Sequence, residues 1–386
     1  MIGRTINKYF LNNNRSKIIV MIILLVAWAI MTIVPSIFKD KTGRLLSDTY
    51  DRNDYFQRGK WFIDGTIPLS EYPQIPTLLF GIDHLTSMWF DTNMQLAVFI
   101  AFFSLEMLFV LFLVFNVLSK LMPPGLSSYA FLVLLPPTLY FTYNRFDILP
   151  AYLCLLAYNA TTKRQWIIVS IILAIATFTK WYPILLFPGF FMYAKTLESK
   201  FQWKMIVVFA ATSSIIVLVS YLYGGFETLL TPYQFHTGRS MDFAALPGLI
   251  DNLIRNLLGV QINILYFFLF FFVLQVSGPI LIFFIKLDSL DTLIHYCIVV
   301  VGLFVLFSRI WSPQWFLWLL PFLIISAKNK KTVWLIIVYN LATYLCFPVI
   351  FDYYGNFSYQ LQVSSLLLYL ILFVIILRSV IKLKQV

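Results

Sequence analysis

Long runs of apolar residues without a charged side chain recur along this chain of 386 residues and limit the folds that it can adopt. Runs such as 18–34 and 361–377 carry apolar residues on every face of a helix. A helix of about 20 such residues crosses the hydrocarbon core of a bilayer, which is roughly 30 Å thick. Hydrophobic residues make up 60% of the chain and charged residues 12%, whereas a soluble domain has about 45–50% and about 25%. The chain is therefore predicted to be an all-α polytopic membrane protein. A soluble enzyme is excluded, and so is a transmembrane β-barrel, whose strands alternate in polarity.

Polar breaks that contain Lys or Arg divide the chain into about twelve predicted membrane spans. Together they form one integral-membrane domain over residues 1–386, with two long outer loops at 39–93 and 224–262. Three consecutive spans between residues 147 and 195 are shorter than a bilayer requires, which indicates broken or re-entrant helices around a cavity. The expected spans are 18–38, 94–118, 126–142, 147–160, 166–179, 182–195, 205–223, 263–286, 292–307, 314–327, 332–350 and 359–377.

Basic residues are distributed unevenly between the breaks. Alternate breaks hold 17 Lys and Arg against three acidic residues, whereas the remaining breaks hold 11 against 13. The positive-inside rule then predicts that both termini are cytoplasmic and that the two long loops face outward. Because topology accounts for the formal net charge of +11, no nucleic-acid partner is implied. The expected location is the inner membrane of a bacterium, and the endoplasmic reticulum stays an alternative.

Two amphipathic segments in the outer loops are predicted to form helices that lie in the membrane interface. Apolar residues between positions 246 and 258 follow the i, i+3, i+4, i+7 spacing, with polar residues on the opposite face. In the first loop, Asp51, Asp54 and Arg58 share one helical face, and aromatic residues nearby favour the interface.

Three basic residues, Arg145, Lys180 and Arg309, lie at the outer ends of predicted spans, against the positive-inside bias. Each is flanked by apolar residues, so each requires a specific counter-charge or ligand. Arginine binds phosphate through paired N–H donors and lysine as a point charge, so the three could together hold a lipid phosphate and stabilise it as a leaving group. Each could equally reach the outer headgroups or pair with an acid such as Asp147.

The first outer loop supplies candidates for a general base. Three carboxylates, Asp48, Asp51 and Asp54, follow the first span closely, and a carboxylate at a membrane-facing cavity can accept a proton from a sugar hydroxyl. The same cluster could instead be the solvated start of a helix, where acidic residues are favoured. Three cysteines without CxxC spacing and three scattered histidines without HExxH spacing indicate no metal site, and no glycine-rich nucleotide-binding motif occurs, so we expect no cofactor.

Four short motifs occur in order over residues 48–321. They are Asp51-x3-Tyr55, Gly65-x2-Pro68 and Glu71-Tyr72-Pro73-x2-Pro76 in the first outer loop, Arg145-Phe146-Asp147-Ile148-Leu149-Pro150, Lys180-Trp181-Tyr182-Pro183, and Ser312-Pro313-Gln314-Trp315-Phe316-Leu317-Trp318. This series resembles the GT-C glycosyltransferases, especially the branch that contains bacterial polyprenyl-phosphate-sugar enzymes and the catalytic subunit of GPI mannosyltransferase I.

The resemblance implies an inverting glycosyltransferase that moves a sugar, mannose first among the candidates, from a polyprenyl-phosphate donor to a lipid-linked or cell-envelope glycan acceptor on the outer face of the membrane. It makes Asp51 the base that deprotonates the acceptor hydroxyl, and it assigns the departing phosphate to Lys180, Arg309 and Arg145. A small membrane partner subunit, as in the mannosyltransferase I relatives, is compatible with it. The implied substrate-binding residues are Glu71, Tyr72, Asp147, Trp181, Tyr182, Trp311, Gln314 and Trp315.

Departures from the family pattern keep alternatives open. Eukaryotic relatives often have an Asp-x-Asp pair where this chain has Thr49 before Asp51, and the usual Tyr-Pro-Pro is replaced by Tyr72-Pro73-Gln74. Asp48 or Asp54 is therefore an alternative base, and a metal is not implied. A secondary transporter or a lipid-linked oligosaccharide flippase is the competing prediction, because transporters also combine many spans with broken helices. A third is an outer-face polysaccharide polymerase or ligase with a diphosphate-linked donor.

Overall fold

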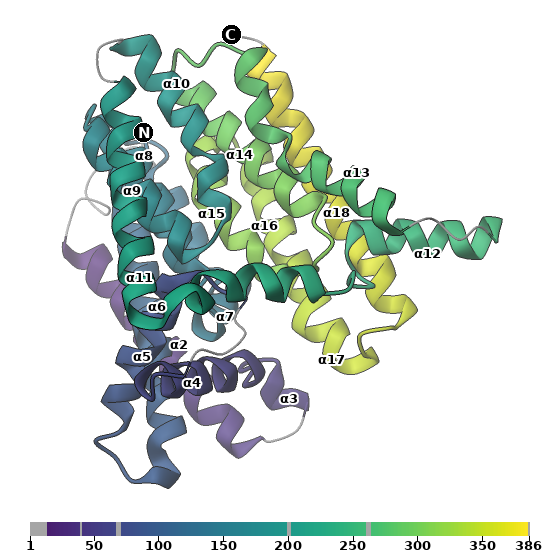
Figure 1. The fold of residues 1–386 in the computed structure, drawn as a ribbon. Coiled ribbons are helices and arrows are strands. Elements are labelled where there is room, and N and C mark those ends of the chain that lie inside the picture. Colours follow the sequence, from purple (N-terminus) through teal and green to yellow (C-terminus); the bar gives the residue numbers. More distant parts are fainter. Residues whose placement is uncertain (1–13, 39–40, 67–70, 199–201, 260–263, 385–386) are drawn as a thin grey trace. The chain divides into compact units, whose positions relative to one another are not determined.

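The computed structural model describes residues 14–38, 41–66, 71–198, 202–259 and 264–384, and every regular element within these ranges is helical (Figure 1). The all-α prediction is thus confirmed for the described residues. Pro68 of the first-loop motif lies outside these ranges. The same holds for three basic residues that are predicted to be cytoplasmic, Arg4, Lys8 and Lys200. Five described helices are long and apolar enough to cross a membrane, at 14–37, 92–121, 203–238, 330–354 and 359–384. With the shorter apolar helices, they make this a membrane-embedded protein.

Contacts between residues divide the chain into two compact units. The first comprises residues 1–184 and 203–239, and the second comprises residues 185–202 and 240–386. One integral-membrane domain over residues 1–386 is the prediction from the sequence, whereas the contacts separate these two units.

The first unit is built around α6 (Thr92–Leu121), an apolar helix that contacts the 3₁₀ helix η1 (Ser127–Leu134) and five α-helices of the unit. These are α2 (Asn14–Ile37), α4 (Tyr50–Ile63), α5 (Gln74–Ser87), α7 (Pro136–Asn144) and α8 (Ile148–Thr162). The remaining elements of the unit are α3 (Lys41–Arg44), α9 (Trp166–Thr179), η2 (Tyr182–Leu185), which reaches the boundary, and α11 (Gln202–Gly238).

The first outer loop folds as a helical hairpin of α4 and α5. The two helices approach closely at Gly59, where an added Cβ would overlap the carbonyl oxygen of Phe80, so glycine is required there. The helix predicted around Asp51, Asp54 and Arg58 is present as α4. Its position in the membrane interface stays a prediction.

Every predicted span coincides with helical structure, but several spans are interrupted. The span at 126–142 breaks where η1 ends and Pro136 begins α7, because proline suits the first turn of a helix and not its interior. The span at 205–223 ends at a kink in α11 formed by Gly224 and Gly225, the latter at φ 64°. Helices α8 and α9 are only 15 and 14 residues long. The number of membrane crossings thus stays a prediction.

In the second unit, α14 (Leu290–Leu306) contacts α15 (Phe316–Ser326) and α18 (Tyr359–Lys384), and both of these contact α16 (Lys330–Tyr344). The predicted amphipathic helix at 246–258 is confirmed as α12 (Leu246–Leu258), whose Leu253, Leu257 and Leu258 are exposed. The other elements are α10 (Phe187–Leu197), α13 (Ile264–Val276), η4 (Gly278–Phe283), η5 (Pro313–Trp315), η6 (Leu345–Ile350) and α17 (Phe351–Tyr354).

Candidate functional site

Arg145 joins two of the predicted base candidates in the first unit. It follows the last residue of α7 in an extended conformation, and its guanidinium is buried. The Nη2 group donates to Asp48 Oδ2 over 2.5 Å, and Nε forms an ion pair with Asp51 Oδ2 over 2.6 Å. The preceding Asn144 accepts a hydrogen bond from the Asp48 backbone N–H over 2.9 Å. The break between α7 and α8 therefore holds the start of α4 in place. Arg145 and its partner Asp48 are 97 residues apart along the chain.

The environments of Asp48 and Asp51 differ although both face Arg145. Burial opposes ionisation of Asp48, but the Arg145 guanidinium outweighs it and the Tyr50 N–H adds to its effect, so the pKa of Asp48 lies below its usual value. Burial, together with the carboxylates of Asp48 and Glu71, raises the pKa of Asp51 to about 6 in spite of Arg145. Of the Asp51 side chain, 23% stays exposed. Asp51 is thus an accessible carboxylate that exchanges its proton near neutral pH.

The third candidate base, Asp54, has a partner on its own helix. Its Oδ2 accepts a hydrogen bond from Arg58 Nε over 2.6 Å, across one turn of α4. Arg58 is buried and its guanidinium lies 5.2 Å from the ring centroid of Tyr72. Asp51, Asp54 and Arg58 were predicted to share a face of this helix, and the ion pair between Asp54 and Arg58 is consistent with that spacing.

Lys180 lies directly after the end of a helix, as Arg145 does. It follows α9 in an extended conformation, with its side chain 14% exposed. Its Nζ is 3.5 Å from Asp147 Oδ1 and lies over the rings of Tyr72 and Phe146, at 4.8 Å and 4.4 Å from their centroids. An ammonium group over two aromatic faces is stabilised by their quadrupoles. The structure thus brings together Lys180, Asp147 and Tyr72, three of the residues predicted to form the site.

Glu71 has partners that the sequence analysis did not find. Arg239 Nη1 donates to Glu71 Oε2 over 3.2 Å, and His236 Nε2 is 3.1 Å from the Glu71 carbonyl oxygen. Burial opposes ionisation of Glu71, but Lys180, Tyr72 and Arg239 outweigh it, so its pKa is lower than usual. These partners come from the end of α11, more than 160 residues away. The sequence contains no motif that pairs either residue with Glu71.

Buried aromatic side chains form a layer against which these charged groups pack. Tyr55 stacks on Phe80 at 4.4 Å between ring centroids, and Tyr72 meets Phe146 edge-on at 5.1 Å. All four side chains are buried, so the groups above them are held against a rigid layer. Tyr72, predicted to line a sugar site, belongs to this layer. Tyr182 is also buried, whereas Trp181 is half-buried and packs against Tyr233.

The remaining predicted site residues belong to the second unit. Asp242 organises their loop, since its backbone N–H donates to the Arg309 carbonyl and its Oδ2 accepts from the Trp311 N–H, both over 2.9 Å. The Arg309 guanidinium lies 5.2 Å from the ring centroid of Phe268. Trp315 is buried and stacks on Trp318 at 4.7 Å, so it contributes to packing. Gln314 is half-buried beside it.

The cluster in the first unit balances acidic and basic side chains. Its carboxylates are Asp48, Asp51, Asp54, Glu71 and Asp147, and its cations are Arg52, Arg58, Arg145, Lys180 and Arg239. Within the described ranges, no group of three or more His, Cys, Asp or Glu side chains is arranged to hold a metal ion. What the cluster can do chemically is accept a proton at Asp51 and place the cation of Lys180 near an anionic ligand.

Comparisons with known proteins add no family to this picture. No protein-family model matches the chain, and no curated protein matches it either. The assignment of a function therefore depends on the residues of the site.

Proposed function

We propose that this protein is an inverting glycosyltransferase that takes a sugar, mannose first among the candidates, from a polyprenyl-phosphate donor, with Asp51 as the general base. The observation that carries the proposal is the state of Asp51, which is partly exposed, fixed by Arg145 and has a pKa of about 6. An efficient general base has a pKa near the operating pH, so that it is ionised and still basic. The series of motifs in the sequence supports the choice of substrate class.

The proposed reaction forms one bond and breaks another at the anomeric carbon. The Asp51 carboxylate takes the proton of the acceptor hydroxyl, whose oxygen bonds to the anomeric carbon from the face opposite the leaving group. The bond from that carbon to the phosphate oxygen breaks, and polyprenyl phosphate leaves with the electron pair. The Lys180 ammonium, near the aromatic layer, would stabilise the negative charge on the departing phosphate.

The proposal also includes a setting in the cell. The distribution of basic residues supports cytoplasmic termini and a site on the outer face, in the inner membrane of a bacterium. Its acceptor would be a glycolipid or a cell-envelope glycan, and a small membrane subunit is a candidate partner.

The first test measures donor binding by the detergent-purified protein. A ligand that binds the native state raises the melting temperature by mass action, with about 2.7 kcal/mol of stabilisation when its concentration is 100 times the Kd. We expect one short-chain polyprenyl-phosphate sugar among mannose, glucose, galactose and arabinose to stabilise the protein, and nucleotide-sugars not to do so. Lys180→Met should reduce the shift, because it removes the cation from the proposed phosphate site.

Lys60→Met is the matched control, since Lys60 is an exposed lysine of α4 in the same unit. Arg309→Ala tests the predicted phosphate ligand of the second unit. Stabilisation by nucleotide-sugars alone, or by no donor, would contradict the proposal. Vesicle assays that detect movement of the lipid-linked sugar without a new glycosidic bond would instead identify a transporter or flippase.

The pH dependence of transfer is a second test. Because Asp51 must be deprotonated to act as a base and its pKa is raised to about 6, kcat/KM should fall about tenfold for each pH unit below 6 and level off above it. The measurement is the initial rate of transfer between pH 4.5 and 8 at low substrate concentration. An acid limb centred near pH 4, the usual range of an aspartate, would contradict the assignment of Asp51.

A further inference from the structure

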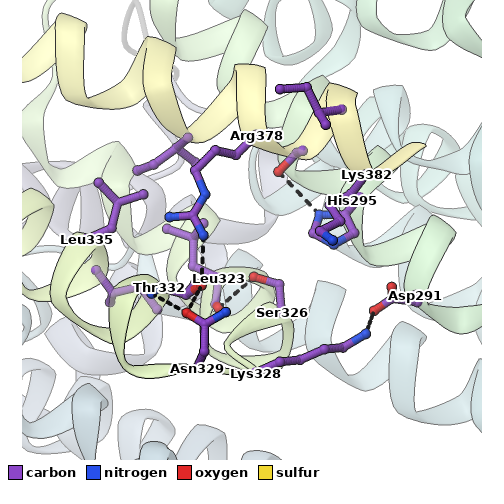
Figure 2. A pocket seen from close by; sticks show the side chains of 14 residues that line it. Asp291, His295, Leu323, Ser326, Lys328, Asn329, Thr332, Leu335, Arg378 and Lys382 are labelled. Atoms are coloured by element: carbon purple, nitrogen blue, oxygen red, sulfur yellow. Dashed lines mark hydrogen bonds and ion pairs between the residues drawn. The ribbon is translucent and has the colours of Figure 1, made fainter. Parts of the chain in front are cut away.

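A cavity of about 300 Å³ opens in the second unit, remote in sequence from the motifs used above. It lies where α14 and α16 begin and where α15 and α18 end (Figure 2). The sequence analysis assigns the charged breaks at this end of the helices, around 328–331 and 378–384, to the cytoplasmic side. None of these residues takes part in the proposed transfer.

Cations outnumber acids in the lining of this cavity. Lys328, Arg378 and Lys382 face a single carboxylate, that of Asp291. Lys328 Nζ donates to Asp291 Oδ1 over 2.6 Å, which neutralises one positive charge. The two other cations leave a net positive charge around the cavity.

Arg378 is held in position and keeps donors for a ligand. Its Nη2 donates to Thr332 Oγ1 over 3.1 Å, as Figure 2 shows. A guanidinium has five N–H donors in a planar fork that matches the oxygens of a phosphate. Ser379 and His295 also line the cavity, and Ser379 Oγ is 3.3 Å from His295 Nδ1. The geometry suits an anion that accepts several hydrogen bonds.

Another part of the lining is apolar. Leu335 and Ile336 of α16 and Ile375 and Ile381 of α18 contribute hydrocarbon surface to the same cavity. Ile381 is also 47% exposed, so the apolar surface continues from the cavity to the outside of α18. A small inorganic anion gains nothing from such a surface, whereas an amphiphile with an anionic head and an acyl chain uses both parts.

We propose that this cavity binds the phosphate group of an anionic phospholipid from the cytoplasmic leaflet. The phosphodiester accepts hydrogen bonds from Arg378 and is attracted by Lys382, while the first carbons of an acyl chain lie along Ile381 and Ile375. Basic pockets between transmembrane helices on the cytoplasmic side bind phospholipid headgroups by the same chemistry. A soluble phosphate ester shares the headgroup chemistry but not the chain.

The test compares ligands by thermal stabilisation of the purified full chain in a neutral detergent. Short-chain phosphatidylglycerol should raise the melting temperature, whereas short-chain phosphatidylcholine, glycerol phosphate and inorganic phosphate should not. The variant Arg378→Gln/Lys382→Gln should weaken phosphatidylglycerol binding by about tenfold or more, because it removes the two cations of the lining other than Lys328, whose charge Asp291 neutralises. The control Lys330→Gln/Lys331→Gln removes the same charge from exposed residues outside the lining and should bind as the wild type does.

Equal stabilisation by glycerol phosphate and phosphatidylglycerol would overturn the lipid assignment in favour of a soluble phosphate ester. Equal losses in both double variants would show attraction to the charged end of the helices in general and would overturn the site. The single variant Arg378→Lys guards against misfolding, since it keeps the charge, and its binding should lie between wild type and the double variant. Donor binding in the first unit is measured separately, so neither result depends on the other proposal.

Discussion

Asp51→Asn is expected to lower the turnover number for glycosyl transfer by about 10²–10⁴-fold, the usual contribution of a general base. Asparagine has the shape of aspartate and its amide oxygen can still accept from Arg145, but it cannot take a proton from the acceptor. Arg145 also keeps Asp48 as an ionised partner. We therefore expect the variant to fold and to bind the donor as the wild type does, so that only the chemical step is lost.

The surroundings of the three aspartates favour Asp51 over the alternatives. Asp48 uses Oδ1 to accept from the Tyr50 N–H and Oδ2 to accept from Arg145, and its pKa is lowered. Asp54 is paired with Arg58 on its own helix. The lowered pKa of Asp48 makes it a weak base. The pKa of Asp51, in contrast to that of Asp48, is raised toward neutrality.

Two parallel variants complete this experiment. Asp64→Asn makes the same change at an exposed residue that ends α4 and should keep full turnover. Asp54→Asn should reduce turnover far less than Asp51→Asn does. Full turnover in Asp51→Asn, measured as product formed per enzyme under saturating donor, would refute the assignment of the base, and a large loss in Asp54→Asn alone would move it to that residue.

Much of the helical structure could be predicted from the sequence because it depends on local patterns. Apolar runs set the positions of α2, α6 and α18, and the spacing of leucines gave both ends of α12 at Leu246 and Leu258. The kink in α11 at Gly224 and Gly225 matches the predicted end of a span. The division into two units could not be predicted in this way, since it depends on which helices pack together and not on the character of any one segment.

Several residues of the cluster in the first unit were singled out from the sequence, but their pairing was not. Sequence motifs pointed to Asp51, Arg145 and Lys180, and the structure places all three in the first unit. The partners of Arg145 could not be predicted from sequence spacing, because its ion pairs with Asp48 and Asp51 join residues about 100 positions apart. These pairs result from the packing of α4 against α6 and its neighbours. Arg145 was predicted to bind a phosphate as one of three cations, with pairing to an acid such as Asp147 as an alternative. Instead, two carboxylates surround its guanidinium.

Replacing Arg145 by methionine is expected to destabilise the protein by about 3 kcal/mol. Removal of one partner of a buried ion pair costs about 3–5 kcal/mol, because the remaining charge stays desolvated and unpaired. About a fifth of each carboxylate is exposed, at 19% for Asp48 and 23% for Asp51, so solvent screens part of the penalty and we expect the lower end of that range. The measurement is equilibrium unfolding in mixed detergent and SDS micelles.

The triple variant Arg145→Met with Asp48→Asn and Asp51→Asn distinguishes the two roles of Arg145. If its guanidinium serves to hold the carboxylates, neutral asparagines should recover most of the lost stability, since no desolvated charge is left. Lys163→Met, at an exposed lysine after α8, is the matched control and should leave stability unchanged. If Arg145 is instead a phosphate ligand, Arg145→Met should weaken donor binding at unchanged stability, and the added asparagines should restore nothing. The ion pairs to Asp48 and Asp51 lead us to expect recovery of stability, because a guanidinium already bound to two carboxylates has to lose them before it can hold a phosphate.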